Sequence, residues 1–275
     1  MLTTAQQQSY RDNGYLVLDQ CFDNEQMDQL KGAANDIVAE FDPNSTRTVF
    51  STKDQTQTRD DYFLSSGDKV RCFFEEDAFD AHGELKQNKA LSINKIGHAL
   101  HQLSPEFKAF SHSQKIKSIA TDLGLVRPRI HQSMYIFKQP KIGGVIRWHQ
   151  DASYFLTTPL SVVTFWLAVE DATIKNGCLQ VQAGGAEMPL KEQFIRHPDN
   201  STELKLLHEL PWPTDDCAQA LEVKKGTLVV FNGLLPHFSA PNVSDKSRHA
   251  YTLHITCANT QYAQENWLQA KPSLL

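Results

Sequence analysis

Hydrophobic positions in the first twenty residues predict a short helix followed by a short strand. Thr3 or Thr4 can cap a helix that ends at Gly14, because glycine readily adopts the left-handed conformation that closes a helix. The apolar run at 15–18 has the composition of a short strand. The chain therefore opens with one helix and one strand.

Three further segments of the N-terminal half carry apolar residues at helical spacing. The first, capped by Asp23 or Asn24, has one apolar face and stops at an Asp-Pro pair. Residues 44–68 are polar and threonine-rich, which predicts a loop with little core material. Amphipathic stretches at 93–103 and 107–123 predict two more helices. The apolar face of the first segment consists of Met27, Leu30, Ala34, Ile37 and Phe41.

From about residue 130 the hydrophobic period changes from that of a helix to that of a strand. Short β-branched and aromatic runs are separated by Pro, Gly, Asn and Asp clusters, which predicts antiparallel strands joined by turns. No linker-like stretch separates the two halves, so we expect one domain over 1–275. Its helical part, up to about residue 128, would pack outside a β core at about 129–260. The predicted strands lie at 133–137, 162–169, 178–182, 228–231 and 250–256.

Composition and charge narrow the class of protein. The 275 residues are 40% hydrophobic and 21% charged, a globular composition that excludes a disordered or fibrous chain. A net charge of -5 offers no basic surface to nucleic acid, and the apolar runs are too short for a membrane span. The N-terminus has no apolar signal region, and the five cysteines form no C-x-x-C pair. We therefore expect a reduced, cytoplasmic location, with neither nucleic acid nor membrane as partner.

The sharpest local motif is the run Trp148-His149-Gln150-Asp151. Residues two apart in an extended segment point the same way, so His149 and Asp151 present an imidazole and a carboxylate on one face. A second histidine from another strand would complete a 2-His-1-carboxylate site, which is typical of non-haem Fe(II) oxygenases. An H-x-D spacing is nevertheless common by chance, and a polar turn is the alternative interpretation.

A downstream segment offers the missing groups. His237 opens an extended segment after an Asn-Gly turn, and Ser239 lies two residues on, on the same face. Arg248 follows His237 by eleven positions, about one hairpin away, so both can face the same cavity. A buried guanidinium needs an anion, and its planar fork suits a carboxylate.

The ordered set His149-x-Asp151, His237 and Arg248 resembles the Fe(II)/2-oxoglutarate-dependent dioxygenases of the phytanoyl-CoA dioxygenase family. Such a resemblance implies a mostly β fold with flanking α-helices. The fold that the resemblance implies is a double-stranded β-helix, a jelly-roll or cupin-like barrel, with N-terminal helices packed outside. The similar segments cover most of the chain in order: Gly14-Tyr-Leu-Val-Leu, Asp61-Tyr-Phe-Leu-Ser-Ser-Gly-Asp-Lys-Val-Arg, Ser92-Ile-Asn-Lys-Ile-Gly-His-Ala-Leu-His, Ser133-Met-Tyr-Ile-Phe-Lys-Gln-Pro, His149-Gln-Asp-Ala-Ser, Ala168-Val-Glu-Asp-Ala-Thr and Glu265-Asn-Trp-Leu.

Carried over by position, the resemblance implies His149, Asp151 and His237 as Fe(II) ligands. Arg248 would bind the far carboxylate of the co-substrate 2-oxoglutarate. The implied reaction is hydroxylation of a C–H bond of a small organic, lipid or acyl-CoA substrate by dioxygen, with release of succinate and CO2. Ascorbate is expected to support activity, and the chain to be a monomer or weak homo-oligomer. Five more residues are implied around the co-substrate, namely Lys95, Met134, Gln150, Trp166 and Ser239.

Some of these residues also have plainer interpretations. A lone lysine on a helix, such as Lys95, is usually solvated, and Met134 fits simple core packing. Trp166 has small neighbours on its face of the predicted strand, which would leave room for a ligand. His98 and His101 stand one helical turn apart and could hold a metal, but a solvated helix face is the simpler interpretation.

The primary substrate stays open. Residues 184–220 depart from the family pattern, and this segment is expected to cover the substrate mouth. The phosphates of an acyl-CoA would need a cluster of cations, for which Lys138, Lys141 and Arg147 near the expected rim are candidates, although loop cations are usually solvated. A metallohydrolase and a non-catalytic 2-oxoglutarate- or metal-binding protein are the alternative functions. A halogenase would need a small residue in place of Asp151.

Overall fold

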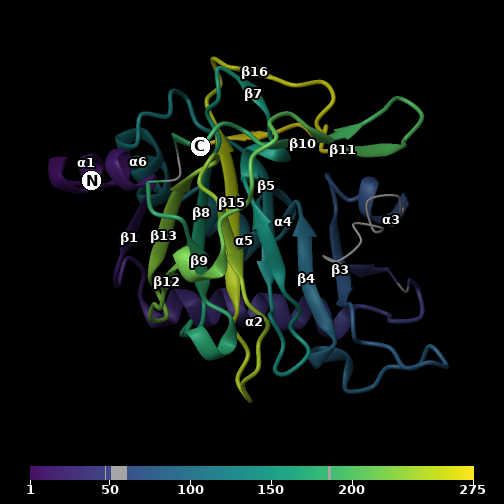
Figure 1. Ribbon diagram of the computed structural model, residues 1–275. Helices are drawn as coiled ribbons and strands as arrows, with labels where there is room; N and C mark the ends of the chain where they lie inside the picture. Colours follow the sequence, from purple (N-terminus) through teal and green to yellow (C-terminus); the bar gives the residue numbers. More distant parts are fainter. Residues whose placement is uncertain (47, 51–60, 185–186) are drawn as a thin grey trace.

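The computed structural model describes residues 1–46, 48–50, 61–184 and 187–275, which form stacked β-sheets with helices on the outside (Figure 1). No helix within these residues is both long and apolar enough to cross a bilayer. The helices are α1 (Thr4–Asn13), α2 (Asn24–Glu40), α3 (Asp61–Leu64), α4 (Leu100–Leu103), α5 (Pro105–Ser111) and α6 (Gln114–Asp122), with single 3-10 turns η2 (Lys89–Leu91), η3 (Asp151–Ser153), η4 (Ile174–Asn176) and η6 (Asp215–Cys217).

The strands belong mainly to two sheets. In the described part of the chain the large sheet has nine strands, ordered β1-β13-β8-β15-β5-β4-β3-β2 with β17 beside β5, and the small sheet has the order β12-β9-β14-β6. Their bounds are β1 (Tyr15–Leu18), β2 (Val49–Phe50), β3 (Val70–Glu75), β4 (Ile93–His98), β5 (Arg129–Ile136), β6 (Ile146–His149), β7 (Thr157–Thr158), β8 (Val163–Ala168), β9 (Leu179–Val181), β10 (Glu192–Arg196), β11 (Thr202–Leu206), β12 (Gln219–Leu221), β13 (Leu228–Asn232), β14 (His237–Ser239), β15 (Ala250–Thr256), β16 (Gln261–Tyr262) and β17 (Ser273–Leu274).

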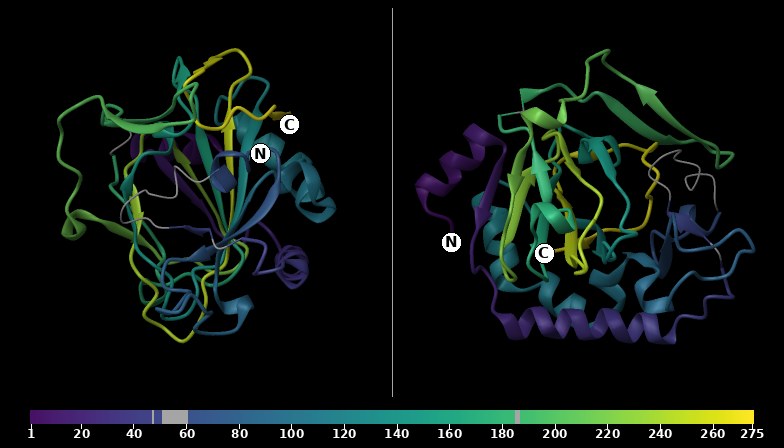
Figure 2. Two further views of the ribbon diagram at one scale, coloured as in Figure 1. Left: turned by 90° about the vertical axis from the view of Figure 1, so that its right-hand side faces the viewer. Right: turned by 60° about the horizontal axis from the view of Figure 1, so that its bottom comes forward.

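The two sheets share an apolar layer, and the helices cover the other face of the large sheet. Trp166 of β8 and Val229 of β13 pack in one cluster with Leu179 of β9. Helix α2 runs across the strands on the outside of the large sheet, as Figures 1 and 2 show. This arrangement is the double-stranded β-helix with outer helices, so the predicted fold is confirmed. The residues that α2 buries in the outer layer are Met27, Leu30, Ala34 and Val38.

The predicted ends of the first two helices are confirmed. The Thr3 side chain accepts a hydrogen bond from the backbone of Gln6 and caps α1, which Gly14 closes with a φ of 79°. Asp23 caps α2 in the same way, and the helix stops before Phe41. All five predicted strands are present, as β5, β8, β9, β13 and β15.

The helix predicted at 93–103 is wrong for residues 93–98, and of this stretch Leu100–Leu103 form a helix, α4. Ile93–His98 form strand β4, which pairs with β3 on one side and with β5 on the other. A strand buried on both faces shows no alternation of polar and apolar residues, so its sequence can resemble a buried helix. The stretch at 107–123 divides into α5 and α6, because the chain turns at His112 and the Ser113 side chain caps the second helix.

The loop predicted at 44–68 is also corrected in part. It contains α3, whose Phe63 and Leu64 are buried, and the short strand β2. Residues 47 and 51–60 lie outside the described residues. Because β3 and β4 also join the large sheet, the N-terminal part contributes strands as well as helices to the fold.

Substitution of Gly226 is expected to destabilise the fold, because this position has a left-handed backbone and no room for a Cβ. Its φ is 85°, and an added Cβ would clash with the carbonyl oxygen of Phe22. Backbone strain of this kind costs about 1–3 kcal/mol. The Gly226→Ala variant should lose at least that much free energy of unfolding, measured by urea denaturation.

Gly32→Ala is the matched control. Gly32 is exposed in α2, and no described atom lies within 4 Å of its added Cβ. Alanine is favoured over glycine in a helix by about 0.5–1 kcal/mol, so this variant should be slightly more stable than the wild type. Equal unfolding free energies for the two variants would contradict the strain at residue 226.

Candidate functional site

Three residues of the small sheet and its flanking turn converge on one point. His149 ends β6, Asp151 begins η3, and His237 starts β14, where it pairs directly opposite His149. The Oδ1 atom of Asp151 lies 3.6 Å from Nε2 of His149 and 3.7 Å from Nε2 of His237. All three ligand atoms lie within 4.8 Å of one another, close enough to bind one metal ion. The structure therefore brings together the predicted set.

Backbone carbonyls fix the orientation of both imidazoles. Nδ1 of His149 lies 2.8 Å from the Arg147 carbonyl, and Nδ1 of His237 lies 3.0 Å from the Leu235 carbonyl. A carbonyl can only accept, so each Nδ1 carries the proton and each Nε2 keeps a free lone pair. This second contact is the one that metal-binding histidines normally make.

The protonation states suit a divalent cation. Burial and, to a lesser extent, the neighbouring His237 lower the pKa of His149 to about 4, although the negative charge of Asp151 acts in the opposite direction. Burial alone would raise the pKa of Asp151, but His237, His254 and His149 outweigh it and hold that pKa below its ordinary value. At neutral pH the site therefore offers a neutral imidazole from His149 and an ionised carboxylate.

Arg248 lies deep in the molecule with part of its guanidinium unmatched. The residue is 2% exposed, its Nε donates to the Gly177 carbonyl at 3.1 Å, and its Nη2 lies 3.5 Å from the Ser239 hydroxyl. Within the described part of the chain Nη1 has no hydrogen-bond partner. Burial lowers the pKa of Arg248 to about 10, which still leaves it charged at neutral pH. A buried cation with a free donor is suited to a carboxylate ligand.

Lys95, Met134 and Trp166 share the inner face of the large sheet. The strand register places Thr252 between Met134 and Trp166, and Lys95 one strand further along. The Trp166 ring centroid lies 5.3 Å from the Arg248 guanidinium carbon. Met134 is only partly buried, so it is not simple core packing.

Lys95 departs from the expected solvated position. It lies on strand β4 and is 6% exposed, because the segment is a central strand and not a surface helix. Burial lowers the pKa of Lys95 to about 7, although the negative charge of Glu75 acts in the opposite direction. Its predicted contact with a co-substrate stays a prediction.

Gln150 is buried between the two metal-site residues, and its amide holds neighbouring loops together. Its Nε2 donates to the carbonyls of Pro189 and Leu234 at 3.2 and 2.8 Å, and its Oε1 accepts from the backbone of Lys191 at 2.8 Å. The role predicted for Gln150 at the co-substrate stays a prediction. In the structure its contacts tie segment 187–220 to the strand of the site.

Segment 187–220 attaches beside the three converging residues. It contains the hairpin of β10 and β11, which projects from the upper right of the molecule in Figure 1. The Trp148 indole donates to Asp215 at 3.0 Å, which adds a second connection to the β6 strand. The position of this segment at the substrate mouth stays a prediction.

Two expectations about polar residues are wrong. His98 and His101 are buried, and their Nδ1 atoms contact the hydroxyls of Ser66 and Ser133 at 2.7 and 2.9 Å, so they form no solvated helix face. His98 lies on strand β4, whereas His101 lies on the short helix α4. Lys138 is also far from solvent.

Lys138 cannot serve as a cation at the rim. It is 2% exposed, and its ammonium donates to the carbonyls of Gly144 and Ser239 at 2.6 and 3.4 Å. Lys141 is exposed and pairs with Asp245 at 2.7 Å. Arg147 lies on strand β6 and is exposed. With Lys138 buried and Lys141 paired, the three cations do not form the cluster considered for an acyl-CoA.

Two residues of the site were missed by sequence reasoning. Thr164 donates a hydrogen bond of 2.5 Å to Oδ2 of Asp151, and Nε2 of His254 lies 3.5 Å from the same oxygen. In the sequence Thr164 is one of the small neighbours on the strand face of Trp166, and no local motif marks it as a partner of Asp151. Finding both contacts requires the pairing of β8 with β15, which no local motif reveals.

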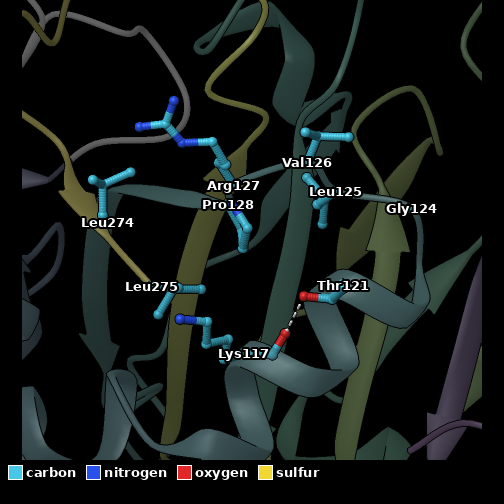
Figure 3. Close-up of a pocket in the computed structure, with 9 residues that line it drawn as sticks. All are labelled: Lys117, Thr121, Gly124, Leu125, Val126, Arg127, Pro128, Leu274 and Leu275. Atoms are coloured by element: carbon cyan, nitrogen blue, oxygen red, sulfur yellow. Dashed lines mark hydrogen bonds between the residues drawn. The ribbon is translucent and has the colours of Figure 1, made fainter.

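A separate hollow lies elsewhere on the surface. It measures about 620 Å³ and is formed by the end of α6, the segment after it and the C-terminal residues (Figure 3). Its lining is mainly aliphatic, with Lys117 and Arg127, and it includes neither a carboxylate side chain nor a histidine. Because a metal and its chemistry need such groups, the converging residues of the barrel are the better candidate site.

Comparison with known proteins agrees with this geometry. The family model "Phytanoyl-CoA dioxygenase (PhyH)" matches residues 10–250. A protein of Arabidopsis thaliana called phytanoyl-CoA dioxygenase is 42% identical over 98% of this chain and 94% of its own. The phytanoyl-CoA dioxygenase domain-containing protein 1 of Danio rerio is 43% identical over 100% of this chain and 97% of its own. The crystal structure of EctD from S. alaskensis with bound Fe has a TM-score of 0.67 at 18% identity, covering 100% of this chain and 86% of that chain.

Proposed function

The chain belongs to the phytanoyl-CoA dioxygenase family and is an Fe(II)- and 2-oxoglutarate-dependent dioxygenase, and we propose that it hydroxylates a C–H bond of a small organic, lipid or acyl-CoA substrate. The convergence of His149, Asp151 and His237 carries this proposal. Such a set takes three adjacent positions of a metal octahedron and leaves three for co-substrate and dioxygen.

The donor set fits Fe(II). His149 and His237 present Nε2 lone pairs because their Nδ1 protons are held by carbonyls, and Asp151 supplies one negative charge. Imidazole and carboxylate ligands suit iron, and two imidazoles with one carboxylate and open positions are the arrangement of non-haem Fe(II) oxygenases. Asp151 also argues against a halogenase, in which halide takes the place of the carboxylate.

The inner face of the barrel fits a dicarboxylate co-substrate. Arg248 presents a free Nη1 next to the Ser239 hydroxyl and the Trp166 ring, in a region closed to water. Bidentate recognition by arginine favours a carboxylate at this end of the cavity. When bound, Fe(II) and 2-oxoglutarate together supply the activation of dioxygen, with release of succinate and CO2.

The residues of this chain supply position and isolation for that chemistry. The carbonyls of Arg147 and Leu235 hold the imidazoles, and Thr164 holds the carboxylate. Burial of Arg248 and Trp166 keeps water from the far end of the co-substrate. Preorganised groups of this kind need little rearrangement during the reaction.

The substrate is proposed only as a class. The relatives' name refers to phytanoyl-CoA, but the loop that follows β5 offers no cluster of cations for its phosphates, since Lys138 is buried and Lys141 is paired. A small organic acid, a lipid or an acyl-CoA bound by other groups is compatible with the site.

We also propose that ascorbate supports turnover. The chain is further proposed to form one domain and to act in the cytoplasm as a monomer or weak homo-oligomer.

Metal reconstitution tests the function against its alternatives. Protein stripped of metal and reloaded anaerobically with Fe(II) should release succinate from 2-oxoglutarate in the presence of oxygen and ascorbate. The same protein loaded with Zn(II) should release none above background, since Zn(II) has no redox chemistry. Hydrolytic activity with Zn(II) and none with Fe(II) would favour a metallohydrolase. Binding of 2-oxoglutarate without any succinate release would favour a non-catalytic protein. Screening candidate substrates for stimulated succinate release then identifies the class.

A further inference from the structure

The two oxygens of Asp151 face different surroundings. Oδ1 faces Nε2 of both His149 and His237, at 3.6 and 3.7 Å. Oδ2 instead accepts the Thr164 hydroxyl at 2.5 Å and lies 3.5 Å from Nε2 of His254. The carboxylate is therefore turned so that one oxygen is available to the metal and the other is occupied by the protein.

His254 is held firmly in place for this contact. It lies on β15 directly opposite Thr164 of β8, so both side chains project from the same face of the large sheet. Its ring stacks on Phe155 at 4.5 Å between centroids and 22° between planes, and the residue is 3% exposed. Nδ1 has no partner within the described residues, so Nε2, which contacts Asp151, is the ring nitrogen that has a polar partner.

We propose that His254 and Thr164 are a pair of positioning residues that hold Oδ2 of Asp151 and so restrict the carboxylate to one bond with the metal. The proposal rests on the proposed function. An octahedral ion bound by two imidazoles and one carboxylate oxygen keeps three positions, which suffice for two co-substrate atoms and dioxygen. If both carboxylate oxygens bound, only two positions would be left. The pair thus protects the position that dioxygen needs.

Three substitutions separate positioning from packing. His254→Phe keeps a ring that can stack on Phe155 but removes the donor to Asp151. His254→Gln restores an amide donor near the place of Nε2. Thr164→Val keeps the shape of the side chain and removes the hydroxyl.

His131 provides a matched control. It too is 3% exposed, stacks on an aromatic ring (Tyr262, centroids 4.2 Å apart and planes at 10°), and has an unpartnered Nδ1 among the described residues. Its Nε2 contacts the Thr256 hydroxyl at 2.8 Å and none of the three converging residues. His131→Phe therefore repeats the loss of a buried, stacked imidazole without touching Asp151.

Co(II) binding to metal-free protein under anaerobic conditions gives a readout that is independent of turnover. Loss of an outer partner of a metal ligand typically weakens metal affinity about 10- to 100-fold. His254→Phe and Thr164→Val should each show a loss in this range, together with changed visible Co(II) bands that report the coordination. His254→Gln should lie between His254→Phe and the wild type, and His131→Phe should match the wild type.

The outcomes distinguish a failure of the positioning role from a failure of the proposed function on which it rests. Suppose that the wild type binds Co(II) and turns over 2-oxoglutarate. If His254→Phe then equals His131→Phe in Co(II) affinity and spectrum, the positioning role is overturned and the proposed function stands. A wild type that releases no succinate with Fe(II) would overturn the proposed function, whatever the variants do. If His254→Phe fails to fold, Thr164→Val decides the question, because an unchanged affinity and spectrum there would equally overturn the pair.

Discussion

Asp151→Ala protein is expected to release no succinate above background with Fe(II) and 2-oxoglutarate, while keeping its fold. The substitution removes one of three groups that converge on the metal position and the single negative charge they provide. Two neutral imidazoles alone bind a divalent cation weakly, because the charge that offsets the ion is gone. Coupled assays of succinate and CO2 release, with iron content measured in the same samples, test this.

The fold should survive because Asp151 contributes hydrogen bonds and not core packing. Its removal leaves the hydroxyl of Thr164 and Nε2 of His254 without a carboxylate, which costs about 1–3 kcal/mol for each buried group left unsatisfied. The loss of a buried charge offsets part of this cost. Thermal unfolding and circular dichroism monitor it, and Asp245→Ala, which removes an exposed aspartate paired with Lys141, is the control that should keep full activity. Normal turnover by iron-loaded Asp151→Ala protein would remove this residue from the metal site.

Elements with clear boundaries in the sequence were predictable from it. Helices α1 and α2 have capping residues at Thr3 and Asp23, and the strand at 250–256 is a β-branched and aromatic run bounded by turns. Strand β4 was not predictable in this way, since its neighbours on both sides bury both of its faces. Its misassignment as a helix also put Lys95 on the surface. Central strands lose their signal because alternation arises only where one face meets water.

The residues of the candidate site also differ in how far the sequence predicts them. His149 and Asp151 are two residues apart, and their convergence follows from local geometry. The contacts of Asp151 with Thr164 and His254 depend on the register of β8 and β15, strands that are about ninety residues apart in the chain and whose pairing is a property of the whole sheet. The carbonyl of Gly177 likewise contacts Arg248 across 71 positions of the sequence. Groups that support a site from neighbouring strands therefore need the structure.

Lys138 shows why the position of a charge is harder to predict than its presence. It follows β5 in a segment that the sequence predicts to be a solvent-exposed loop, yet its side chain is buried. There its ammonium meets the carbonyls of Gly144 and Ser239. Burial lowers the pKa of Lys138 well below its ordinary value, and the positive charge of Arg248 adds to this effect.

Arg248→Ala should weaken 2-oxoglutarate binding by about two to three and a half decades and leave Fe(II) affinity nearly unchanged. Truncating one partner of a buried charge pair costs about 3–5 kcal/mol, and about 1.4 kcal/mol corresponds to one decade in affinity. Lys138 cannot replace the lost charge, because its ammonium is already bonded to two carbonyls. Arg248→Lys keeps a point charge but loses the planar fork, so its affinity should lie between those of alanine and wild type.

The co-substrate affinity is measured by anaerobic titration of 2-oxoglutarate into Fe(II)-loaded protein, followed through the metal-to-ligand charge-transfer band. Titration with Fe(II) alone measures the metal affinity. Arg129→Ala is the matched control. Arg129 also donates to backbone carbonyls, those of Cys257 and Thr260 at 3.1 and 3.5 Å, and has a buried Nε without a partner in the described chain. It lies at the start of β5, away from Ser239 and Trp166, so its loss should not change co-substrate affinity. Equal 2-oxoglutarate affinities for Arg248→Ala and Arg129→Ala would mean that the free Nη1 of Arg248 binds no carboxylate, and that its burial serves the packing of the sheet instead.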